Sequence, residues 1–156
     1  MSNSETPIVK YCSFEDALRN SGFLLYTISG TSMLPFLRQK IDIVEIHPID
    51  NHAKKYDVVL FKRGGKYILH RVLKVRLNDY VVCGDNNIRR EYGITDGMIL
   101  GVMTRVIRNG KSIYPTDWKY RLYVHLWYDF YPVRVAILYV KKLFCRAGHR
   151  LKKLLG

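Results

Sequence analysis

Two short segments of this chain carry residue types that can perform acyl transfer. The first is 29–37, Ser-Gly-Thr-Ser-Met-Leu-Pro-Phe-Leu, in which Ser32 follows a glycine-containing turn. The second is 69–72, Leu-His-Arg-Val, in which His70 ends an apolar run 38 positions after Ser32. A serine hydroxyl becomes a nucleophile when a base removes its proton, and neutral histidine suits that task near physiological pH. Ser32 and His70 are therefore a candidate nucleophile and general base.

The elements that must position this pair are predicted to be mainly strands. Ser13, with Asp16 three residues later, predicts the start of a short helix that ends at Gly22. The turn Arg63-Gly64-Gly65-Lys66 predicts a hairpin. Apolar and alternating segments predict strands over 23–28, 41–46, 56–62, 67–76, 80–83 and 98–108. Strands this short, with turns this regular, indicate an antiparallel barrel or a pair of curved sheets, with the histidine on a strand and the serine in a turn.

Composition limits the class of protein. The 156 residues are 48% hydrophobic, which suits one globular core with an appendage. The first seven residues are polar, and no run of about 18 apolar residues follows, so we expect neither a signal peptide nor a membrane span. A cytoplasmic or peripheral membrane location follows. Three widely spaced cysteines and five histidines without ligand spacing predict no disulfide framework, no metal and no cofactor.

The positive charge is concentrated at the C-terminal end. The net charge of +13 divides into +5 over 1–117 and +8 over 118–156. Apolar residues at steps of three and four from Tyr123 to Leu154 predict an amphipathic helix with many aromatic side chains. We therefore predict a β body over 1–117 and a basic aromatic tail over 118–156 that docks on an anionic membrane surface. The alternative is that the tail packs on the body. Because the sequence contains no motif that reads DNA or RNA, we do not expect nucleic acid as a binding partner.

Six sequence blocks occur in a defined order: 30–35, 42–46, 57–61, 70–72, 84–87 and 99–102. Their order resembles the conserved boxes of the type I signal peptidase family, within the wider superfamily of signal-peptidase-like and LexA-like serine peptidases. The resemblance covers roughly 23–108. Many members of this family have a lysine at the position of the base. This sequence has His70 there, and in this respect it resembles the branch that includes the eukaryotic endoplasmic-reticulum and archaeal enzymes.

This resemblance implies a signal-peptidase/LexA-like, β-barrel-like core over 1–117, with Ser32 as the acylating nucleophile and His70 as the general base. It also implies cleavage of a signal or leader peptide that binds as an extended strand. The alternative is a catalytically inactive peptide- or lipid-binding module of the same fold, which would show no turnover.

A histidine base is usually oriented by a carboxylate. Asp85 is the first choice, because its Gly-Asp-Asn-Asn turn matches the family box beside the base; the alternative is that it orders its own turn. Glu91 and Asp96 are the other candidates for the third catalytic residue. The oxyanion hole would use the backbone N–H of Ser32, and Gly30 occupies the position where some relatives place a hydroxyl donor.

Overall fold

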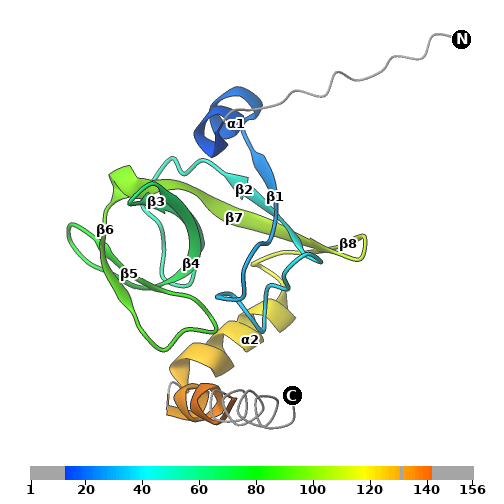
Figure 1. The fold of residues 1–156 in the computed structure, drawn as a ribbon, viewed down its shortest axis with the longest axis vertical. Helices are drawn as coiled ribbons and strands as arrows, with labels where there is room; N and C mark the ends of the chain where they lie inside the picture. Colours follow the sequence, from blue (N-terminus) through cyan, green and yellow to red (C-terminus); the bar gives the residue numbers. More distant parts are fainter. Residues whose placement is uncertain (1–12, 131, 142–156) are drawn as a thin grey trace, which may run out of the picture.

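The computed structural model describes residues 13–130 and 132–141. Its eight strands form one antiparallel, strongly curved sheet with the order β1-β2-β7-β3-β4-β5-β6, and β8 pairs with β7 (Figure 1). The strands are β1 (Leu24–Thr27), β2 (Ile43–His47), β3 (Val58–Arg63), β4 (Lys66–Val75), β5 (Tyr80–Cys83), β6 (Glu91–Ile94), β7 (Ile99–Arg108) and β8 (Lys111–Ile113). The helical elements are α1 (Phe14–Ser21), the short 3₁₀ turn η1 (Asp96–Met98) and α2 (Trp118–Asp129). The prediction of a mainly β, antiparallel fold is confirmed.

The helix α1 begins and ends where local chemistry requires. The Ser13 hydroxyl accepts a hydrogen bond from the Asp16 backbone N–H at 3.1 Å, which caps the first turn. Gly22 adopts a positive φ of 74° and donates its N–H to the carbonyl of Leu18. The predicted cap and stop are both confirmed.

The strands β3 and β4 form the predicted hairpin at the centre of the fold. Gly64 and Gly65 form its two-residue turn with φ angles of 56° and 74°, which glycine adopts without strain. This turn fixes a register in which Val59 of β3 lies opposite His70 of β4. The candidate base thus stands on a long strand with a hydrogen-bonded neighbour on each side.

Two strands were not among those predicted from the sequence. β6 is four residues long and contains Gly93 at a φ of 73°, so neither its length nor its composition signals a strand. β8 has three residues and pairs only with the end of β7. The six predicted strands are present, and their ends differ from the predicted ones by at most two residues.

The hydrophobic core lies on both faces of β3, whose first four residues are all buried. Val58 and Leu60 belong to one cluster, and Val59 and Phe61 belong to the other. The first cluster continues into α2, because the side chains of Tyr120, Val124 and Tyr128 are buried against it. Their spacing of four residues places them on one face of the helix.

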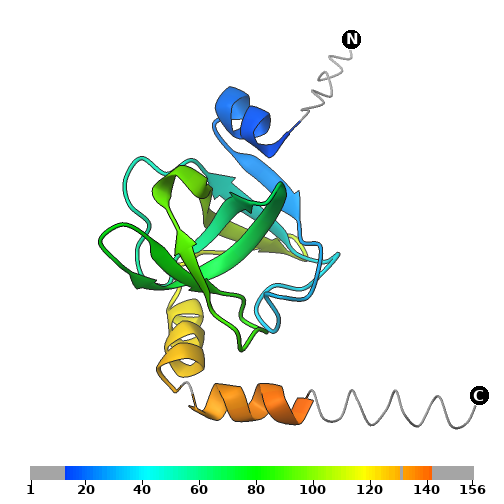
Figure 2. The same ribbon diagram turned by 60° about the vertical axis from the view of Figure 1, so that its left-hand side comes forward.

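The first part of the predicted tail therefore packs on the β body and does not extend from it as a separate segment. α2 begins at Trp118, at the predicted boundary, but it packs on the body, and a further helix over 132–141 follows it (Figure 2). The predicted apolar stripe packs on the body only at its start: Tyr123 lies against the core, whereas Leu126, Val133 and Ile137 are exposed. The last part of the stripe, 142–156, lies outside the described residues. In the part of the chain that the structure describes, no helix is long and apolar enough to cross a membrane.

If α2 belongs to the core, a substitution on its buried face will destabilise the whole domain. Val124→Ala should lower the free energy of unfolding by roughly 2 kcal/mol, from lost burial and an unfilled cavity. The control Leu122→Ala lies on the exposed side of the same helix and should stay within about 0.5 kcal/mol of the parent. Urea denaturation measures both, and equal effects would contradict the packing.

Candidate active site

Ser32 lies in the loop between β1 and β2, and a second loop holds it in place. The carbonyl of Ser32 accepts a hydrogen bond from the backbone N–H of Asn86 at 2.7 Å. The Asn86 side-chain amide donates to the neighbouring carbonyl of Thr31 at 3.1 Å. Gly30 turns the chain into this segment with a φ of 91°. The serine turn is thus attached to the Gly-Asp-Asn-Asn loop, 84–87, between β5 and β6.

His70 lies on β4 and is 5% exposed. Its Nδ1 lies 2.8 Å from Oε1 of Glu91, at the start of β6, although the carboxylate is not aligned with the ring N–H direction. Burial lowers the pKa of His70, while the negative charges of Glu91 and Asp85 raise it and offset part of that effect. The imidazole is therefore neutral, and able to accept a proton, over a wider pH range than an exposed histidine.

The other ring nitrogen of His70 and the serine turn both approach Gly84. A Cβ on Gly84 would lie 2.9 Å from His70 Nε2 and 2.5 Å from the Ser32 carbonyl oxygen. Both distances are below any real Cβ contact, so only glycine permits this approach. The structure therefore brings the backbone of Ser32 and the imidazole of His70 close to the same residue, Gly84.

The structure changes which of the three candidate acids is favoured as the partner of His70. Glu91, an alternative from the sequence, lies at His70 Nδ1. Asp85, the first choice, is fully buried, and its carboxylate is occupied by Arg71. Asp96 accepts a hydrogen bond from Tyr80 at 2.5 Å, and its other oxygen lies 2.9 Å from His52. Asp85 acts on the histidine through its charge alone, whereas Glu91 contacts the ring.

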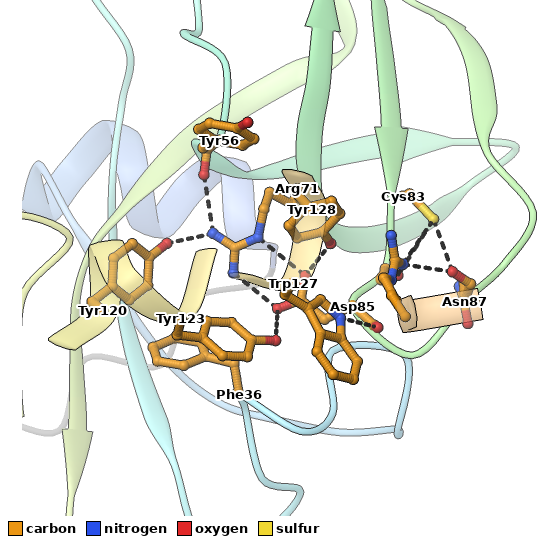
Figure 3. A network of polar contacts seen from close by, with 12 residues as sticks. Phe36, Tyr56, Arg71, Cys83, Asp85, Asn87, Tyr120, Tyr123, Trp127 and Tyr128 are labelled. Atoms are coloured by element: carbon orange, nitrogen blue, oxygen red, sulfur yellow. Dashed lines mark hydrogen bonds and ion pairs between the residues drawn. The ribbon is translucent and has the colours of Figure 1, made fainter. Parts of the chain in front are cut away.

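Arg71 and Asp85 form a buried ion pair that sequence reasoning missed (Figure 3). Nε and Nη2 of Arg71 donate to the two carboxylate oxygens at 3.1 and 2.9 Å. Tyr123 and Tyr128 of α2 donate to the same carboxylate at 2.9 and 2.5 Å. Burial opposes the Arg71 charge, but Asp85 outweighs it and raises the pKa of Arg71 well above its ordinary value. Both charges are thus neutralised by direct contacts, as burial requires.

The C-terminal helices hold the backbone of the 84–87 loop. Trp127 of α2 donates its indole N–H to the carbonyl of Asp85 at 2.9 Å (Figure 3). Arg134, in the helix over 132–141, is 1% exposed and donates to the carbonyls of Gly84 and Asn87 at 2.9 and 2.6 Å. Tyr128 lies against its guanidinium, with 4.5 Å from the ring centroid to the central carbon. These contacts fix the loop that in turn holds the serine turn.

A cavity of about 200 Å³ opens beside the nucleophile candidate. Ser32 lines it together with residues from α1, β1, β3 and β4, among them Tyr26, Leu60 and Leu69. Among the described residues no group of three or more His, Cys, Asp or Glu side chains could hold a metal ion. The space therefore offers a small, partly apolar recess next to a hydroxyl.

Comparison with models of protein families and with curated proteins found no match to this chain.

The buried ion pair should dominate the stability of the site. Arg71→Met leaves Asp85 as an uncompensated buried charge and should cost about 3–5 kcal/mol of unfolding free energy. Arg76→Met removes a pair of similar geometry, with Asp79, at the surface and should change stability little. Denaturant unfolding of the two variants tests the difference; similar losses would show that the buried pair has no special role.

Proposed function

We propose that this protein is a serine endopeptidase of the signal-peptidase-like type, with Ser32 as the nucleophile and His70 as the general base. The observation that carries the proposal is the orientation of His70. A carboxylate lies at its Nδ1, and its Nε2 and the Ser32 carbonyl both lie close to one backbone position, Gly84. A histidine with an acid beside one nitrogen and its other nitrogen available to take a hydroxyl proton is the arrangement that serine hydrolases require.

The proposed reaction proceeds in two acyl-transfer steps. Nε2 of His70 takes the Ser32 hydroxyl proton while Oγ bonds to the peptide carbonyl carbon. The imidazolium, stabilised by Glu91, gives this proton to the leaving amine as the peptide C–N bond breaks. Water then loses a proton to His70 and attacks the acyl carbon, and His70 returns this proton to Oγ as the ester bond between Oγ and the acyl carbon breaks, which releases the acid and restores Ser32.

The serine turn also supplies the donor for the oxyanion. Within the described residues, no hydrogen-bond partner occupies the backbone N–H of Ser32, so it is free to bind the developing negative charge. At Gly30 the space where a side chain would stand is open, so a substrate carbonyl can approach the turn. Because Gly30 has no hydroxyl, the backbone N–H carries this function in the proposed mechanism.

The surroundings of Ser32 support an extended peptide as the substrate class. β1 is an edge strand of the sheet and leads directly into the serine turn. A peptide that adds to this edge would run past Ser32, as in β-strand addition. The cavity of about 200 Å³ beside Ser32 suits a small side chain next to the cleaved bond. We therefore propose a signal or leader peptide with small residues at this position.

Ser32→Ala should abolish peptide cleavage, because no hydroxyl remains to form the acyl-enzyme. The control is Ser112→Ala, an exposed serine on β8 that does not line the cavity, which should keep the parent rate within a few-fold. Mass spectrometry of a synthetic peptide mixture rich in small residues measures the products. If the parent protein cleaves nothing, or if Ser32→Ala cleaves as the parent does, the proposal is wrong.

The pH dependence should report the buried histidine. Activity requires neutral His70, so kcat/KM should rise with pH through the pKa of His70, which burial places below its ordinary value of 6.5. Glu91→Gln removes a charge that raises this pKa, so the acid limb should move to still lower pH. The plateau should also fall by roughly 10²- to 10⁴-fold, because the ring loses its orienting acid. An unchanged acid limb in Glu91→Gln would contradict the assigned role.

A further inference from the structure

The outer side of α2 exposes a row of large apolar side chains. Trp118, Leu122 and Leu126 are 70%, 49% and 55% exposed, and their spacing of four residues places them along one face. The opposite face packs on the sheet, so this helix is apolar on both sides. A soluble surface helix would carry polar residues on the outer face.

The next helix, over 132–141, repeats this arrangement. Val133, Ile137 and Val140 are exposed on one face, whereas Arg134 and Leu138 are buried on the other. The six exposed side chains of the two helices are called the outer apolar face below: Trp118, Leu122, Leu126, Val133, Ile137 and Val140.

The charges around the outer apolar face are nearly all positive. Lys119, Arg121 and Lys141 are exposed on the same two helices. Asp129 is the one acid between positions 118 and 156, and it is held by Tyr56, whose hydroxyl donates at 2.5 Å, and by His125 at 2.8 Å. An apolar surface bordered by exposed cations is complementary to an anionic lipid surface, where acyl chains lie beneath negative headgroups.

We propose that the outer apolar face docks this protein on an anionic membrane surface. The leucine, isoleucine and valine side chains enter the boundary between headgroups and acyl chains, and Trp118 lies at the headgroup level, where indoles are favoured. The lysines and Arg121 bind lipid phosphates. A protein interface would be expected to deplete lysine and does not require an excess of one charge.

The inner side of the same two helices connects the docking surface to the candidate active site. The consequence for catalysis that follows rests on the proposed function. Trp127 and Arg134 bind the 84–87 loop, and Asn86 of that loop binds the Ser32 carbonyl. The cleft is thus connected to the membrane-facing helices by direct hydrogen bonds. Docking would hold the cleft at a fixed position beside the bilayer, where a membrane-tethered peptide is available.

Co-sedimentation of the full chain with vesicles tests the proposal. The parent protein should bind phosphatidylcholine vesicles that contain phosphatidylglycerol, and bind pure phosphatidylcholine weakly. Leu122→Glu with Leu126→Glu should weaken binding by at least about tenfold, since two anchors become anions. The matched control is Leu77→Glu, at a leucine 97% exposed in the turn between β4 and β5, which should bind as the parent does.

Three outcomes would overturn the proposal. The first is no binding to anionic vesicles; the second is binding that the paired leucine substitutions leave unchanged. The third is a concentration-dependent dimer in light scattering that the same substitutions abolish without any vesicle binding, which would assign the face to a second copy.

Cleavage of soluble peptides by the paired variant separates this inference from the proposed function. Retained cleavage with lost vesicle binding supports docking as a separate property. Vesicle binding by a protein that cleaves no peptide would refute the peptidase and leave the docking surface intact.

Discussion

The buried pair of Arg71 and Asp85 is the interaction on which the site depends. Neither side chain is accessible to water, so each charge needs a complete set of partners within the protein. Tyr120, Tyr123 and Tyr128 of α2 and the backbone carbonyl of Tyr56 supply the remaining hydrogen bonds. The pair therefore joins the sheet, the 84–87 loop and the helix in one rigid unit.

This unit explains how adjacent residues of β4 serve two purposes. Side chains of successive strand residues point to opposite faces, so His70 and Arg71 lie on different sides of the sheet. Arg71 positions the 84–87 loop through Asp85, and the loop places Gly84 against the imidazole of His70. Through Asn86 the same loop holds the serine turn. Support and proposed chemistry thus begin from neighbouring positions of one strand.

The sequence revealed the parts of the site that local patterns encode. Ser32 and His70 stood out by residue type and block order, and the glycine hairpin fixed the strand on which His70 lies. The orienting acid could not be chosen, because Glu91 reaches the ring only through the pairing of β5 with β6, and that short strand contains Gly93. The Gly-Asp-Asn-Asn turn drew attention to Asp85, whose partner Arg71 gave no sequence signal. The packing face of α2 was equally hidden, since the helix has apolar residues on two sides and only tertiary contacts select between them.

The most direct test of the central claim, that Ser32 and His70 act together in acyl transfer, is to trap the covalent intermediate. An activated peptide ester is mixed with the protein, the reaction is stopped with acid, and the mass of the protein and of its fragments is measured. We expect an added acyl group on the fragment that contains Ser32, and no such group in His70→Ala. Turnover of the ester without an adduct at Ser32, or an adduct that forms equally well without His70, would contradict it.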